Sequence, residues 1–176
     1  MLTNNFINLS KIVMLGNRYD RTCSIKGRNV SGEERYFVPV NSAAYPSTDS
    51  MNSFNASPTS SGWSVGTGNT PATVNDYQLE STITSNISGS VTVSPINDTT
   101  LNRVIKRVSV IVTNTGGNNI SINEIGFKAS IYSNTGVNQI GQNSVYLLYR
   151  EVLSVPVTLT PGESTSFVID FYVTTE

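Results

Sequence analysis

The sequence contains no histidine, so it lacks the side chain that most often serves as a general base and as a zinc ligand. It has one cysteine, Cys23, which excludes an intrachain disulfide and, without histidine, a Cys-His nucleophile. A lone cysteine is typical of a packing residue, and the absence of disulfides suits a protein made in a reducing cytoplasm. We therefore expect no catalytic thiol, no metal site and no cofactor.

Charge is also scarce: 13% of the 176 residues are charged, with 11 basic and 12 acidic side chains. Because the basic and acidic charges nearly cancel, the chain has no strong positive potential that would attract nucleic acid or an anionic membrane, so we expect neither as a partner. No apolar run is long enough to cross a bilayer, and Lys11 interrupts the apolar N-terminal segment, so we expect no signal peptide.

Serine, threonine and asparagine make up about a third of the chain, well above ordinary usage. These residues are poor helix formers and suit exposed strand faces and long turns. The composition predicts a mainly β protein with a polar, nearly uncharged surface.

Paired carboxylates are the remaining route to hydrolysis, and they would have to lie about 5–10 Å apart in a cleft. Glu33 and Glu34 are adjacent, so on a strand they point to opposite sides. Asp76 has the spacing of a helix cap with Thr73, and solvent explains Glu80. The other acids are scattered along the sequence: Glu124, Glu151, Glu163 and Asp170. We expect no catalytic residue and no enzymatic activity.

The clearest structural signal is the alternation of β-branched residues between 104 and 131. Apolar side chains share one parity from Val104 to Val112, and the alternation resumes at Ile120 after a turn rich in Asn and Gly. From Ile125 onward the apolar residues fall on the opposite parity. This slip predicts a β-bulge or a strand kink at Asn123-Glu124.

The C-terminal third predicts two long strands. Apolar residues keep one parity from Val145 to Leu159, and they alternate again from Phe167 to Val173. Between them, residues 160–163 read Thr-Pro-Gly-Glu, which is typical of a type II turn. We expect these two strands to form a β-hairpin.

Weaker patterns predict further elements. Strands are expected over 33–40 and 63–68, and a hairpin is expected from 80–86 and 89–93. The capping-box spacing predicts one helical turn over 76–79, with Leu79 closing the end of the core.

The N-terminus carries an apolar stripe at helical spacing, formed by Leu2, Phe6, Leu9 and Val13. It predicts a short helix over about Asn4 to Leu15, which is marginal alone in water. The stripe either covers an open edge or end of the β domain or docks into a neighbouring subunit. Residues 41–62 hold little apolar surface and predict a long loop or arm, with anchors on a neighbour at Tyr45, Met51 and Phe54.

Together these patterns predict an antiparallel β-sandwich, immunoglobulin-like or jelly-roll-like, with a short N-terminal helix. The expected organisation is a helix over 1–16 and a single domain over 17–176 that carries the arm at 41–62. Trp63 and Tyr77 could form an aromatic platform for a sugar ring, although core packing explains a lone tryptophan more often.

Several segments, in order, resemble a group of small virion proteins of tailed bacteriophages. They are MLTNNF, SVGTGNTPATVNDYQLES, VTNTGGNNISINEIGFKASI and LLYREVLSVPVTLTPGESTSFVIDF. The resemblance implies an immunoglobulin-like sandwich without enzymatic activity, made in the host cytoplasm and built into the tail, neck or capsid surface. Its partners would be copies of itself and other virion proteins. The alternative is a carbohydrate-binding module of a phage fibre, in which Trp63 and Tyr77 would stack on a host glycan.

Overall fold

The computed structural model describes residues 1–6, 26–37, 51–98, 103–134 and 142–174. A short helical piece begins at Asn4, and the other regular elements are mainly strands. The strands are β1 (Lys26–Arg28), β2 (Glu34–Phe37), β3 (Gly62–Gly66), β4 (Ile87–Asp98), β5 (Arg103–Asn114), β6 (Ile120–Asn134), β7 (Gln142–Leu159) and β8 (Ser164–Thr174). The mainly β composition predicted from the sequence is confirmed.

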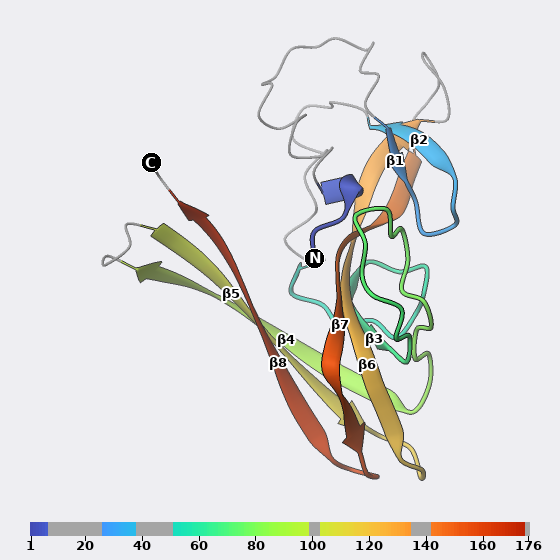
Figure 1. Cartoon of the computed structure of the whole chain (residues 1–176), viewed down its shortest axis with the longest axis vertical. Coiled ribbons are helices and arrows are strands. Elements are labelled where there is room, and N and C mark those ends of the chain that lie inside the picture. The colour runs from blue at the N-terminus through green and yellow to red at the C-terminus, as the bar shows by residue number, and fades with distance from the viewer. Residues whose placement is uncertain (7–25, 38–50, 99–102, 135–141, 175–176) are drawn as a thin grey trace.

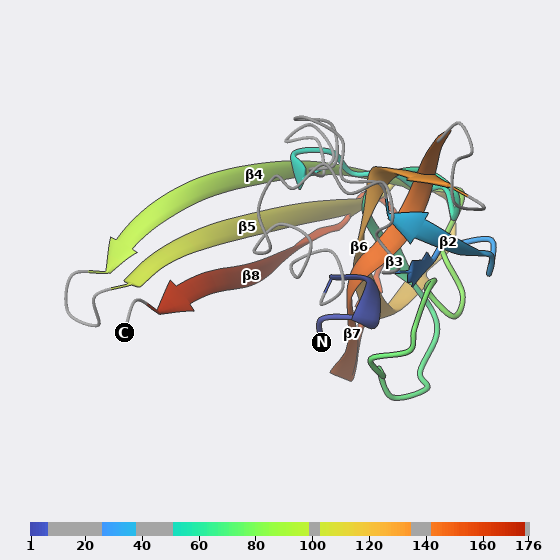
Figure 2. The ribbon, with the colours of Figure 1, turned by 90° about the horizontal axis from the view of Figure 1, so that it is seen from above.

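The strands form two antiparallel sheets. In the five-stranded sheet A, β6 pairs with β7 along one edge and with β3 and β2 along the other, and β1 lies beyond β2. The three-stranded sheet B has the order β4-β5-β8. Figures 1 and 2 show that the sheets face each other near the β7–β8 turn and that sheet B then projects away from sheet A. The fold is an antiparallel β-sandwich, as predicted.

The core lies between the facing halves of the two sheets. Val108, Val110 and Val112 on β5 are completely buried, which confirms the alternation read from the sequence. Trp63 is also completely buried, and its ring lies 5.1 Å from that of Phe127. Burying an aliphatic or aromatic side chain of this size contributes about 1.5–3 kcal/mol, so this cluster dominates the stability of the sandwich.

The predicted irregularity at Asn123-Glu124 is confirmed. Ile122 pairs with Val157 and Glu124 pairs with Val152, so the register shifts at this point and the extra residues belong to β7. Because of this shift, the apolar residues before Asn123 and those after Glu124 both face the core, although they have opposite parity in the sequence.

A second bulge was not predicted. Phe127 pairs with Tyr149 and Lys128 with Leu147, which leaves Leu148 as the extra residue on β7. The single parity expected along β7 is therefore wrong: Leu148 is buried in the core. Val155, expected on the apolar face, is 73% exposed because it lies in the first irregularity.

The expected hairpin of β7 and β8 is also wrong, although its turn forms. The N–H of Glu163 donates to the carbonyl of Thr160 at 3.0 Å, and Gly162 has the positive φ of 80° that a type II turn requires. However, β7 pairs with β6 and β8 pairs with β5. The turn therefore carries the chain from one sheet to the other, so the apolar faces of the two strands belong to opposite layers of the core.

The hairpin expected within 80–93 does not form either. β4 begins at Ile87 and pairs with β5 over its whole length. Before it, Asn86 takes a left-handed φ of 58°, and Thr82 makes only an isolated bridge to Gly66. A few alternating polar residues were not enough to define the strand partner.

Other expectations have mixed outcomes. The helical turn over 76–79 is replaced by a tight turn in which the N–H of Asp76 donates to the carbonyl of Thr73, but Leu79 is buried as predicted. The strand expected over 33–40 is β2, and the strand expected over 63–68 is β3. Most of the predicted N-terminal helix and Cys23 lie outside the described residues.

Candidate functional site

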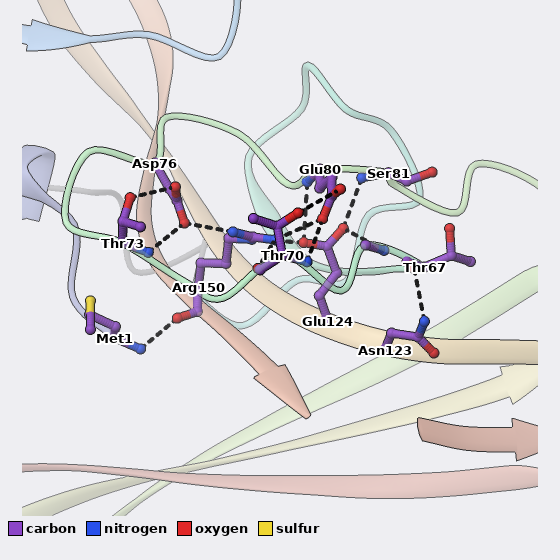
Figure 3. A network of polar contacts seen from close by, with 11 residues as sticks. Met1, Thr67, Thr70, Thr73, Asp76, Glu80, Ser81, Asn123, Glu124 and Arg150 are labelled. Atoms are coloured by element: carbon purple, nitrogen blue, oxygen red, sulfur yellow. Dashed lines mark hydrogen bonds and ion pairs between the residues drawn. The ribbon is translucent and has the colours of Figure 1, made fainter. Parts of the chain in front are cut away.

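The loop that joins β3 to β4 lies against the outer face of sheet A, where it is fixed to one arginine and one glutamate (Figure 3). Glu124 comes from β6 and Arg150 from β7, and the Arg150 Nε donates to Glu124 Oε2 at 2.8 Å. The two side chains are only 0% and 4% exposed. Because Glu124 follows the register shift, its side chain points out of the core while Ile125 points in.

Arg150 also holds the loop directly. Its Nη1 donates to Asp76 at 2.7 Å, and its Nη2 donates to the carbonyl of Thr70 at 3.1 Å. The carboxylate of Glu80 lies 3.5 Å from Nη2. The guanidinium fork thus joins β6, β7 and both ends of the loop in one network.

Glu124 is satisfied entirely by groups of its own chain. Besides Arg150, its carboxylate accepts backbone N–H groups from Gly68 at 3.2 Å, Ser81 at 2.8 Å and Glu80 at 3.2 Å. A Cβ added at Gly66 would lie 2.4 Å from both a Glu124 oxygen and the Ser81 carbonyl. The Gly-x-Gly pair is therefore a backbone cradle for an anion, but the anion it holds is the side chain of Glu124.

The pKa shifts around Arg150 do not favour proton transfer. Burial would raise the pKa of Asp76, but hydrogen bonds from Arg150 and Thr73 outweigh it and lower that pKa. Hydrogen bonds from the backbone and hydroxyl of Thr70 lower the pKa of Glu80. A general acid needs a raised pKa, so both carboxylates are shifted in the wrong direction for that role.

The fold brings Asp76, Glu80 and Glu124 together on one guanidinium. Of the acids expected to be scattered, Glu124 therefore joins a cluster, whereas Asp76 makes the expected contacts with Thr73 and Glu80 is 42% exposed. What the cluster can do chemically is clamp a loop, because every carboxylate in it already accepts hydrogen bonds from within the chain. Glu33 and Glu34 do not converge: Glu33 pairs with Arg35, while Glu34 pairs with Lys26.

Two shallow pockets adjoin the turn at the tip of this loop, with volumes of about 330 and 230 Å³. Asn75, Asp76 and Tyr77 line both of them. In the larger pocket the Arg28 guanidinium lies 5.1 Å from the centre of the Tyr77 ring, and Lys26 pairs with Glu34. These cations are thus already engaged by groups of the same chain.

The aromatic pair predicted for a glycan is not brought together. Trp63 is 0% exposed and its ring N–H donates to the carbonyl of Met51, so the indole face is closed to a sugar. Tyr77 belongs to the loop over the opposite face of sheet A. The core-packing interpretation of Trp63 is the one that the structure supports.

The residues predicted to contact another subunit fall into three groups. Leu2 is 36% exposed and makes an isolated bridge to Tyr149, on the edge of β7 that does not pair with β6. Three pack partly buried against the core of their own chain: Phe6, Met51 and Phe54. Three lie outside the described residues: Leu9, Val13 and Tyr45. A role between subunits stays a prediction for all seven.

Sequence reasoning missed the two long borders of sheet B. Within the described residues, β4 with 12 residues and β8 with 11 each pair on one side only, with β5. Each contains a single charged residue, Asp98 in β4 and Asp170 in β8. Natural sheet edges are usually protected by charges, bulges or short length. These borders therefore offer backbone donors and acceptors to another strand.

Across the described ranges, no group of three or more acidic, histidine or cysteine side chains could hold a metal ion. Nor does any helix there have the length and apolar character needed to cross a bilayer.

Neither a protein-family model, nor a curated protein, nor a solved structure matches this chain.

Proposed function

We propose that the protein is a non-enzymatic structural component of a virion, in its tail, neck or capsid surface, where it assembles with copies of itself and with other virion proteins. The observation that carries the assembly role is the projecting sheet B, which has two long borders and one charged residue on each. Such borders favour association with another strand. The virion as the setting rests on the resemblance of the ordered sequence segments.

The polar network on the other sheet supports a structural role. Its carboxylates are held by Arg150 and by backbone N–H groups, and the pKa values of Asp76 and Glu80 are lowered. A site that reacts with a substrate needs a group free to exchange its partner during the reaction. The network instead anchors the β3–β4 loop and stiffens sheet A.

Sedimentation of the purified full chain tests the assembly role. We expect species that are multiples of the 19.0 kDa chain, with a mass distribution that shifts upward as the protein is concentrated from micromolar to millimolar. A single species of 19.0 kDa over that whole range would contradict self-assembly.

A further inference from the structure

The two borders of sheet B differ in chemistry. Pro95 lies inside β4, opposite Lys106 of β5. A proline has no N–H, so it is accepted in a sheet where its nitrogen faces away from the paired neighbour. Pro95 therefore removes a donor from the free border of β4, which is one of the ways in which natural sheets protect an edge. β8 contains no proline and no lysine.

β4 and β8 also differ in their residue patterns. β4 has serine or threonine at every second position from Ser88 to Ser94, with Val91 and Val93 on the other parity, as expected for a strand with one face exposed to water. β8 instead reads Phe-Val-Ile from Phe167 and again Phe-Tyr-Val from Phe171. Val168 points to the outer face and is 57% exposed. Ser166 and Asp170 share this outer face, so Val168 is an exposed apolar side chain between polar ones, and a partner that covered it would bury apolar surface.

A second copy of this chain fits the free border of β8. β4 and β8 both run antiparallel to β5, so they run parallel to each other. Joining β4 of one copy to β8 of the next, in the same orientation, would need a parallel ladder and would meet the missing donor of Pro95. Joining β8 to β8 about a two-fold axis gives an antiparallel ladder.

The charges of β8 select the register of such a pair. Asp170 already accepts two hydrogen bonds from Arg107, both at 2.8 Å, on the outer face. An axis at Asp170 would place two carboxylates directly opposite each other, which is unfavourable. An axis at Val168 instead places the exposed Val168 side chains of the two copies opposite each other. It also places Asp170 opposite Ser166 and Phe167 opposite Ile169.

We propose that two copies of this chain pair through the borders of β8 that no other described strand occupies, antiparallel about a two-fold axis at Val168, and so form one continuous sheet of six strands, three from each copy. This deepens the proposed function, on which it rests, by naming the self-contact. Figure 2 shows β8 as the border of the projecting sheet, on the side away from β4.

Cysteine crosslinking tests the register. Cys23, the only thiol, is first replaced by serine, and Val168→Cys is then introduced and oxidised mildly. Directly opposed residues of an antiparallel pair lie about 4.5–5.5 Å apart between Cα atoms, which suits a disulfide. The matched control is Thr92→Cys in the same background, on the outer face of β4. We expect a covalent dimer from the β8 variant, formed roughly tenfold faster than from the β4 control.

A second variant and sedimentation separate the outcomes. Val168→Lys places a charge on an exposed position of the border, so we expect it to abolish the dimer while the fluorescence of Trp63 stays that of the folded chain. Equal crosslinking at both cysteine positions, or at neither, in a protein that still sediments as a multimer overturns the β8 contact and leaves the proposed assembly role standing. A monomer at every concentration in the Cys23→Ser background overturns both.

Discussion

Replacing Arg150 with alanine should remove the clamp that fixes the β3–β4 loop to sheet A. The substitution leaves Glu124, at 0% exposure, without the cation that pairs with it, although its three backbone donors remain. It also removes the bonds from the guanidinium to Asp76 and to the carbonyl of Thr70. Breaking a buried ion pair by deleting one partner typically costs about 3–5 kcal/mol.

This loss of stability should be large relative to the total free energy of unfolding. A domain of this kind has a free energy of unfolding of about 5–15 kcal/mol, so Arg150→Ala should bring the protein close to its stability limit. Trp63 is the only tryptophan and is buried between the sheets, so its fluorescence reports unfolding in a urea titration. The measured quantity is the free energy of unfolding extrapolated to water.

Arg107→Ala is the matched control, since it breaks a similar bidentate pair on the surface. The Arg107 and Asp170 side chains are 43% and 33% exposed, and exposed pairs are worth about 1 kcal/mol or less. If Arg150→Ala lowers the free energy of unfolding no more than Arg107→Ala does, the buried network is not a clamp and the reasoning is refuted.

The same pair of variants gives a pH test. The folded-state pKa of Asp76 is below its ordinary value of 3.8, so its contribution is present above that value and is lost as pH falls through the lower folded pKa. Arg150→Ala should weaken this acid dependence, whereas Arg107→Ala should leave the Asp76 part of it intact. If the free energy of unfolding of Arg150→Ala falls at acid pH as steeply as that of the unaltered protein, the guanidinium does not hold the Asp76 carboxylate.

Two other substitutions test neighbouring features of sheet A. Gly66→Ala should destabilise by about 1–3 kcal/mol, because the added Cβ would lie 2.4 Å from the Ser81 carbonyl, whereas Gly117→Ala meets no atom within 4 Å and should be nearly neutral in the same urea assay. Burial lowers the pKa of Lys128 to about 8, so between about pH 8 and 9, below the range in which tyrosines titrate, the unfolded chain binds a proton that the folded chain partly loses, and stability should rise with pH. Lys128→Met should abolish that rise, and a flat profile in the unaltered protein over this pH range would contradict the assignment.

Local signals predicted those parts of the fold that depend only on local chemistry. The alternation at Val108, Val110 and Val112 gave a buried strand face, and the parity slip gave the shift at Glu124. The turn at Gly162 was predicted correctly because four consecutive residues specify a type II turn, and glycine at the third position permits the positive φ.

The choice of strand partners could not be predicted in this way. A period of two fixes which side chains share a face, but it does not decide whether the next strand lies beside it or across the core. That is why the turn at Gly162 was correct and the β7–β8 hairpin was wrong. The same limit applies to β4, whose pairing with β5 depends on the whole length of both strands.

The polar cluster was missed because its members are far apart in sequence. Asp76 and Arg150 are joined only after β6 and β7 have paired and the loop has folded back over them. The sequence did contain two signals. Arg150 directly follows a run of apolar residues on a strand, and Glu124 lies at the parity slip. The contact of Glu124 with the Gly-x-Gly segment appears only in the folded chain. A charge inside an apolar strand predicts a buried partner, but it does not say which acid that partner is.

The two assembly modes suggested by this chain differ in their entropic cost. An arm that orders only on contact loses conformational entropy at that step, whereas a preformed strand does not. The part of the expected arm between Met51 and Ser61 already packs on its own chain, where the carbonyl of Ser53 accepts the backbone N–H of Trp63. β8 is held along its length by β5, so the strand is already formed, and no other described strand pairs with its outer border. The structure therefore favours the β8 border over residues 51–61 as the contact between copies.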